Sequence, residues 1–135
     1  MTSLLAEPMV FDATTIAELV PTPAGDDLSA KLLWRSGSSA SGVMHARAGA
    51  ELRSHHHPDT AHHMWIMEGG CRVLGRDVGP GAYVRVPAGC EHAVSVGPWG
   101  CTFFFVYESE PAASASHADD HIPRPPLTAS TDPVM

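Results

Sequence analysis

The sequence predicts an all-β protein of 135 residues, folded as one sandwich or barrel domain. Glycine and proline turn signals recur about every eight to twelve residues between Gly42 and Pro98. The runs between these turns are short and rich in β-branched and aromatic residues, as strands are. No amphipathic pattern longer than about three helical turns interrupts them.

Seven runs have strand character, in chain order "KLLWR", "VMHARA", "HHMWIM", "CRVL", "AYVRVP", "HAVSV" and "CTFFFVYE". In "AYVRVP", Tyr83 and Arg85 share one face, and Val84 and Val86 share the other. Both faces of "CTFFFVYE" are apolar, which predicts a strand buried on both sides. The segment "CRVLGRDV" predicts a tight hairpin that turns at Gly75.

Composition divides the chain into three zones. Residues 1–30 predict an N-terminal arm with one short helix or strand around "TIAEL", and residues 31–108 predict the barrel. Residues 109–135 are rich in Pro, Ser, Ala and Asp, a composition that cannot bury enough surface to fold alone. This C-terminal tail is expected to be disordered, or to lie across a neighbouring subunit or the mouth of the site.

Charge and hydropathy argue against two classes of partner, nucleic acids and membranes. The formal net charge is −7 and the Lys and Arg residues are scattered, so the basic stripe of a nucleic-acid-binding protein is absent. No apolar run approaches the roughly 18–20 residues of a membrane span, and the N-terminus lacks the basic region of a signal peptide. We therefore expect a cytoplasmic protein whose partner is a small-molecule substrate.

The three cysteines, Cys71, Cys90 and Cys101, are odd in number and form no CxxC pair. This pattern argues against a disulfide framework and against a cysteine-rich zinc site. We expect all three to be reduced and structural.

Histidines are concentrated in "HHHPDTAHH", which holds five of the nine in the chain. The cluster is internal and interrupted, unlike a purification tag, and neither a paired-cysteine finger half nor an HExxH motif is present. In an extended chain His55 and His57 leave on one face, and His56 on the other. After the turn at "PDTA", His62 shares a face with Met64 and Ile66, whereas His63 faces the opposite way. A hairpin would bring His62 beside the first pair.

The spacing around these histidines is regular. Gly49 is followed after five residues by His55-x-His57, after four more by His62, and after six more by Gly69. Downstream, Gly81 precedes Pro87-x-Gly89 by five residues. His92 follows after two residues and Val96 after three more, with Val94 and Val96 on the same strand face as His92.

Together these segments resemble the two motifs of the cupin superfamily, whose members are small double-stranded β-helix (jelly-roll) barrels. Two positions depart from the family pattern, because His62 stands where a glutamate is usual and Val96 where an asparagine is usual. The segment between the motifs, residues 70–80, is also short. The resemblance implies a four-histidine metal site made of His55, His57, His62 and His92.

Such a site would hold one divalent transition metal ion, and imidazole ligands do not choose between iron, manganese, nickel and zinc. Two interpretations stay open for His45 on the preceding strand: it lines the pocket, or it faces solvent. Two also stay open for Asp59, which either orients a ligand imidazole by a hydrogen bond or caps the turn. The remaining inward positions are apolar and form either a substrate pocket or plain core: Met44, Met64, Ile66, Val84, Val94, Phe103 and Phe105.

Three functions stay open. The resemblance favours a dioxygenase that binds a small enolisable or hydroxylated aromatic substrate on the ion. A non-redox Lewis-acid cyclase or isomerase, similar to polyketide cyclases, is the first alternative. A metal-loaded binding or sensor barrel without turnover is the second. The resemblance also implies a homodimer.

Strand alternation yields a test of the ligand set. We expect His57→Ala to lose bound metal and to melt at a lower temperature, because a ligand that binds only the folded state stabilises it. His56→Ala, on the opposite face, should change neither the metal content by elemental analysis nor the melting temperature. Loss of metal from His56→Ala but not from His55→Ala would mean that the strand register is shifted by one residue.

Overall fold

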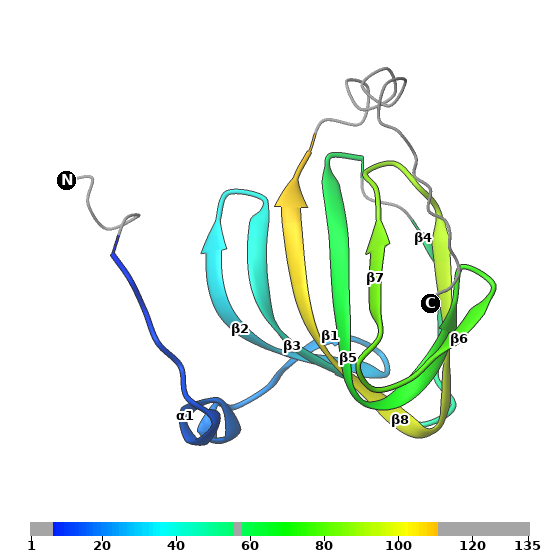
Figure 1. Ribbon diagram of the computed structural model, residues 1–135, viewed down its shortest axis with the longest axis horizontal. Helices are drawn as coiled ribbons and strands as arrows, with labels where there is room; N and C mark the ends of the chain where they lie inside the picture. The colour runs from blue at the N-terminus through cyan, green and yellow to red at the C-terminus, as the bar shows by residue number, and fades with distance from the viewer. Residues whose placement is uncertain (1–6, 56–57, 111–135) are drawn as a thin grey trace.

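Two long antiparallel strands, β5 (Thr60–Val73) and β8 (His92–Ser109), organise the fold in the computed structural model, which describes residues 7–55 and 58–110 (Figure 1). Of residues 53–55 only the backbone is described. The two strands pair with each other over most of their length. Each is strongly bent, so that each contributes one half to each of two layers.

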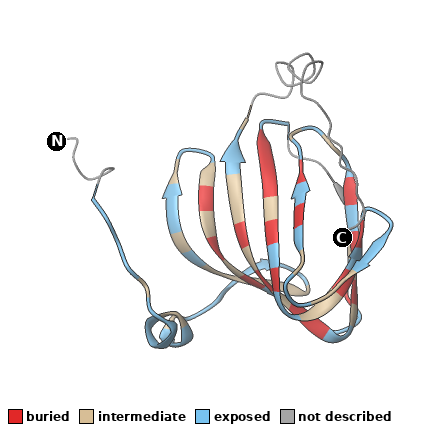
Figure 2. Ribbon diagram, in the orientation of Figure 1, coloured by how far each residue is buried: buried red, intermediate tan, exposed pale blue. Residues whose placement is uncertain are grey.

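The first layer contains the N-terminal half of β5 and the C-terminal half of β8. Three strands extend it on the β8 side, and one strand, β7 (Tyr83–Val86), extends it on the β5 side. The three are β1 (Thr22–Gly25), β2 (Leu28–Ser36) and β3 (Ser39–Ala46). This layer carries the larger part of the core, as the buried stripes on β3, β5, β7 and β8 show (Figure 2).

The second layer contains the C-terminal half of β5 and the N-terminal half of β8. β4 (Glu51–His55) pairs with β8, and β6 (Arg76–Val78) pairs with β5. The predicted hairpin joins β5 to β6: Leu74 and Gly75 both have positive φ, as a two-residue type I′ turn requires. All pairs are antiparallel, which confirms the predicted all-β fold class.

The bend of the long strands depends on two glycines that touch. Gly69 in β5 has φ +72°, and an added Cβ there would lie 1.9 Å from the carbonyl oxygen of Gly100 in β8. Gly100 has φ +78°, and register shifts flank the crossing on β5. The sequence predicted turns between separate strands at Gly69 and Gly97. In the structure Gly69 lies inside β5 and Gly97 lies inside β8, and both strands are continuous.

The N-terminal arm is fixed to the first layer by one lysine. The short helix α1 (Ala13–Glu18) begins at Asp12, whose side chain accepts a hydrogen bond from the Thr15 amide at 2.8 Å. Lys31 of β2 donates to the carbonyl oxygens of Ile16 and Ala17 at the end of the helix. The segment "TIAEL" is thus largely helical. None of the helices among residues 7–55 and 58–110 has the length and apolarity needed to cross a membrane.

One part of the strand prediction was wrong. Phe103 and Phe105 of "CTFFFVYE" are buried, whereas Phe104 and Val106 are only half-buried. Among residues 7–55 and 58–110 no second layer covers the outer side of this part of β8, so buried and half-buried residues alternate there.

The glycine contact gives a stability test. Gly69→Ala should unfold at a markedly lower denaturant midpoint, because the methyl group would collide with backbone that cannot move aside. Gly75→Ala is the matched control: its φ is +76° but no atom lies within 4 Å of the added Cβ. We expect the control to lose about 1–2 kcal/mol of unfolding free energy, because alanine is strained in the left-handed backbone. The loss for Gly69→Ala should be more than twice as large. Equal losses would contradict the role of the contact.

Candidate functional site

His62 lies on the inner face of β5 and is 7% exposed. Its backbone pairs with that of Tyr107 in β8, and the two rings stack with centroids 4.1 Å apart and planes inclined by 19°. Phe105 packs in turn against Tyr107, with centroids 4.9 Å apart. The imidazole of His62 is therefore held in one orientation by a neighbouring aromatic column.

His92 is the first residue of β8 and is also 7% exposed. Its Nδ1 lies 3.3 Å from the carbonyl oxygen of Cys90, in the turn that precedes the strand. A carbonyl oxygen only accepts hydrogen bonds, so Nδ1 carries the proton and the lone pair of the neutral ring is on Nε2. A backbone carbonyl holding the second ring nitrogen in this way is typical of histidines that ligate metals.

The two buried imidazoles come from different layers and meet edge to face. Their centroids are 5.6 Å apart and their planes are inclined by 76°. Metal–nitrogen bonds of about 2.1 Å place two imidazoles on one ion with centroids roughly 4.5–6.5 Å apart. The separation of His62 and His92 falls within this range, so the pair fits a shared metal ion.

The backbone brings a third predicted ligand to the same place. His55, the last residue of β4, is the register partner of His92. The side chain of His55 and the whole of His57 lie outside the described part of the chain, so half of the four-histidine set is a proposal. Among the side chains that are described, no three His, Cys, Asp or Glu residues gather closely enough to hold a metal ion.

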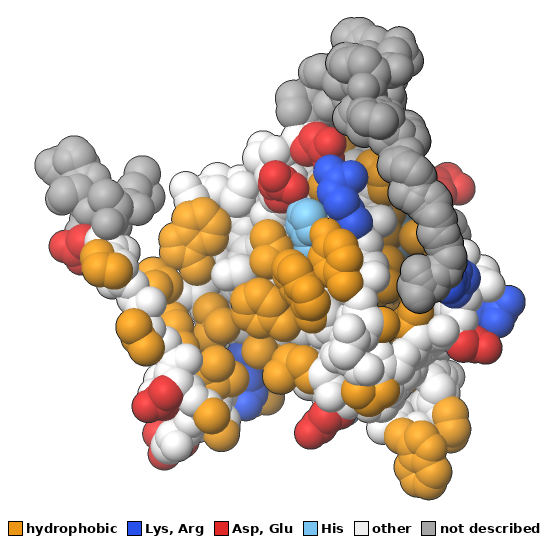
Figure 3. Space-filling view, in the orientation of Figure 1, with side chains coloured by type: hydrophobic (Ala, Val, Ile, Leu, Met, Phe, Trp, Pro, Cys, Tyr) orange, Lys and Arg blue, Asp and Glu red, His pale blue; other side chains and the backbone are white. Residues whose placement is uncertain are grey.

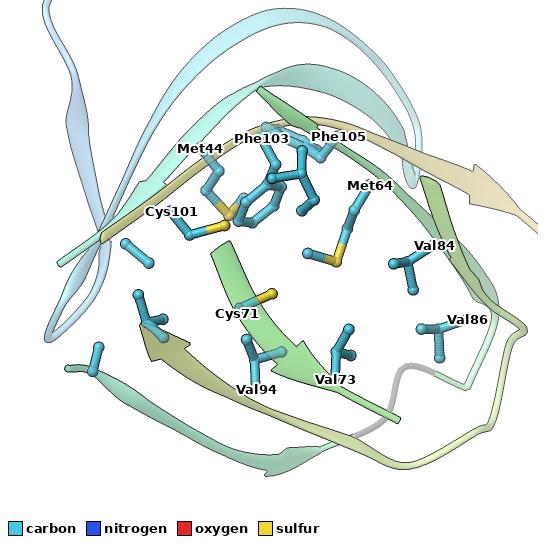
Figure 4. Close-up of a cluster of buried hydrophobic side chains, with 14 of the residues drawn as sticks. Met44, Met64, Cys71, Val73, Val84, Val86, Val94, Cys101, Phe103 and Phe105 are labelled. Atoms are coloured by element: carbon cyan, nitrogen blue, oxygen red, sulfur yellow. The ribbon is translucent and has the colours of Figure 1, made fainter. Parts of the chain in front are cut away.

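A narrow cavity of about 70 Å³ lies against the two histidines. Its walls are mostly apolar and none of its described lining residues is charged, although Tyr107 adds a phenol. The side chains point into the space between the layers from both sides (Figure 4). The lining consists of Leu28, Met44, Ala46, Leu52, His62, Met64, His92, Val94, Val96, Cys101, Phe103, Phe105 and Tyr107.

The predicted pocket residues divide into two groups. Five line the cavity: Met44, Met64, Val94, Phe103 and Phe105. Ile66 and Val84 are buried in the core but are not among the lining residues. The lining residues that sequence reasoning missed are Leu28, Ala46, Leu52, Cys101 and Tyr107. Tyr107 could have been found, since it continues the inward alternation of Phe103 and Phe105.

Burial raises the pKa of the Tyr107 phenol above its ordinary value, because the phenolate would lose its hydration. Its hydroxyl therefore stays protonated at neutral pH. Tyr107 thus adds a neutral phenol to the cavity lining beside His62.

Two further histidines, His63 of β5 and His45 of β3, lie on the outer face of the first layer. His63 points away from the cavity, where it is hydrogen-bonded to the Tyr83 hydroxyl and, at 2.9 Å, to Glu108. Around it Trp65, Met67 and Tyr83 are exposed in an apolar area of the surface (Figure 3). His45 also lies on this outer side, exposed and 2.9 Å from the Thr102 hydroxyl. His45 therefore faces solvent and does not line the cavity.

The fold of bent strands shared between two layers is matched by known proteins. The family model of the ChrR cupin-like domain matches residues 8–111. The chain belongs to this cupin family. No curated protein sequence matches it significantly.

Solved cupin structures share the fold at low sequence identity. An RmlC-like cupin from Shewanella frigidimarina is 18% identical, with TM-score 0.61, over 69% of this chain and 86% of that chain. KdgF from Halomonas sp. is 16% identical, with TM-score 0.63, over 77% and 96%. A structure of Rhodobacter sphaeroides SigE in complex with the anti-sigma ChrR is 14% identical, with TM-score 0.60, over 68% and 50%. The double-stranded β-helix fold is thereby confirmed.

Adjacent histidines on opposite faces of β5 allow a matched test of metal binding by this cupin. We expect His62→Ala to lose most bound metal in elemental analysis and to bind added zinc at least about tenfold more weakly. His63→Ala removes a contact with Glu108 on the outer face and should keep the metal. If both variants retain metal equally, the ion is not held at the cavity.

Proposed function

We propose that this cupin is a metal-dependent dioxygenase acting on a small enolisable or hydroxylated aromatic substrate. The proposal has His55, His57, His62 and His92 as ligands of one divalent ion. The observation that carries it is the pair of buried imidazoles, 5.6 Å apart, at one end of an apolar cavity. Buried polar side chains in an apolar lining are costly unless they are hydrogen-bonded or bind a ligand such as a metal ion.

The charge of the site supports an anionic substrate. Four neutral imidazoles leave the full double positive charge of a divalent ion, whereas the usual glutamate would cancel part of it. No described residue of the cavity lining carries a charge that could pair with a bound anion. An enolate or phenolate oxygen would therefore be attracted to the ion itself, which would supply Lewis acidity and, when redox-active, a route for electrons to oxygen.

The protein residues have separate tasks in this scheme. The Cys90 carbonyl and the Tyr107 ring hold His92 and His62 in fixed orientations. Tyr107 contributes a phenol ring to the cavity wall beside His62. Met44, Met64, Phe103 and Phe105 exclude water and receive the apolar part of the substrate.

Cavity size limits the substrate. Pockets for drug-sized ligands usually measure about 300–1,000 Å³. The cavity here is only about 70 Å³. This volume favours a small β-diketone or a single-ring phenol over a multi-ring flavonol.

A metal-loaded sensor without turnover is the second candidate. It is supported by the family match to the ChrR cupin-like domain and by the structural likeness to the complex of SigE with the anti-sigma ChrR. In that case the cavity would bind a small ligand and alter contacts with a protein partner.

Oxygen consumption tests the proposal. The protein would be loaded separately with iron, manganese, nickel or zinc and supplied with a panel of small β-diketones and catechols. We expect oxygen uptake with a redox-active ion, none with zinc, and a loss of at least about 100-fold in His62→Ala. His63→Ala should retain activity because it lies on the outer face.

Two outcomes would decide against turnover. Absence of uptake with every ion and substrate would overturn the dioxygenase proposal. Ligand-dependent stabilisation in a thermal-shift assay, without uptake, would favour the sensor instead.

A further inference from the structure

Three side chains of neighbouring strands form one hydrogen-bonded chain on the outer face of the first layer. His63 of β5 lies between Tyr83 of β7 and Glu108 of β8, because β5 pairs with both of these strands. The Nδ1 atom of His63 is hydrogen-bonded to the Tyr83 hydroxyl, and its Nε2 atom lies 2.9 Å from Oε1 of Glu108. None of the three lines the cavity, so this chain of groups is separate from the His62–His92 pair.

The chemistry of the partners fixes the direction of each hydrogen bond. A carboxylate only accepts, so Nε2 of His63 carries the proton and donates it to Glu108. In the neutral ring Nδ1 then holds the lone pair, and the Tyr83 hydroxyl donates to it. A base is thus aimed at the phenolic proton, and a carboxylate holds the other side of the imidazole. Hydroxyl, imidazole and carboxylate in this order activate the nucleophile in many acyl-transfer enzymes.

The aromatic neighbours hold the rings in place and leave the phenol open to solvent. The Trp65 centroid lies 4.8 Å from that of Tyr83 and 6.1 Å from that of His63, and Phe104 lies on the other side of Trp65 with centroids 6.0 Å apart. The His63 side chain is only 15% exposed, whereas Tyr83 is 48% exposed. A donor molecule from solution can therefore approach Tyr83 over an apolar surface, which suits an aromatic donor.

We propose that Tyr83 is a nucleophilic tyrosine that accepts acyl groups from aryl esters. His63 is its general base, and Glu108 is a positioning residue that acts through His63. The site needs no metal ion and shares no residue with the histidine pair in the cavity. It therefore stands or falls separately from the dioxygenase proposal.

The transfer balances without any oxidant or reductant. The Tyr83 oxygen attacks the carbonyl carbon of the ester while its proton passes to Nδ1 of His63. The new O–C bond forms, and the bond between the carbonyl carbon and the aryl oxide breaks. The imidazolium, stabilised by the Glu108 carboxylate, then gives its proton to the aryl oxide, which leaves as a phenol. Tyr83 ends as an ester that carries the acyl group.

Labelling of the full-length chain with p-nitrophenyl acetate tests the proposal. Competing groups are few, because the chain contains only two tyrosines and a single lysine, Lys31. We expect a first phase that releases one p-nitrophenolate per chain and adds one acetyl group to the intact mass. In a digest the acetyl group should be on Tyr83. Tyr107, which lines the cavity, serves as the internal control and should stay unlabelled.

Variants of the base and of the carboxylate separate activation from plain exposure. His63→Gln should acylate Tyr83 at least about 100-fold more slowly and lose the solvent deuterium isotope effect that proton transfer gives the wild-type rate. Glu108→Gln keeps an acceptor for Nε2 but removes the charge, so an intermediate loss of rate is expected. His45→Gln is the matched control, since His45 is exposed and hydrogen-bonded to the Thr102 hydroxyl, and it should react like the wild type.

Three outcomes would overturn the proposal. One is an acetyl group found only on Lys31, on the N-terminal amine or on a histidine. Another is labelling of Tyr83 no faster than that of free N-acetyltyrosinamide. The third is a rate in His63→Gln equal to that of the wild type. The digest of wild-type protein decides the first two by itself, which covers a variant that fails to fold.

Discussion

The close approach of Gly69 and Gly100 is the constraint on which the rest of the structure depends. A side chain at position 69 would collide with the backbone of β8, so the absence of a Cβ there lets the two long strands approach closely where they bend. Because β5 and β8 bend, each serves both layers, and the space between the layers is enclosed by the same two strands. The cavity, both buried histidines and the buried cysteines all lie along them.

The contact between His62 and His92 results from the way β5 and β8 each serve both layers. His62 comes from the half of β5 in the first layer, and His92 from the half of β8 in the second, so their imidazoles approach across the barrel. Each ring is oriented by a different device: Tyr107 stacks on His62, and the Cys90 carbonyl accepts from His92. Rings fixed in this way lose little conformational freedom when an ion binds, which favours tight binding.

Polar and apolar functions are distributed along one enclosed space. The imidazoles and the Tyr107 phenol supply the polar groups of the lining, and methionine and phenylalanine side chains form much of its apolar wall. The outer face of β5 has a separate character, with His63, Tyr83 and Glu108 in one hydrogen-bonded chain.

The sequence by itself determined the fold class, the hairpin at Gly75 and the opposite directions of His62 and His63, because turn residues and a period of two are local properties of a chain. Motif spacing also indicated His62 and His92 as partners. Only the tertiary structure decided that Tyr107 stacks on His62 and that Leu52 and Cys101 border the cavity. Alternation along a strand predicts which face each side chain takes. Which residues of another strand it meets depends on the pairing register and on bulges, and these are set by contacts between residues far apart in sequence.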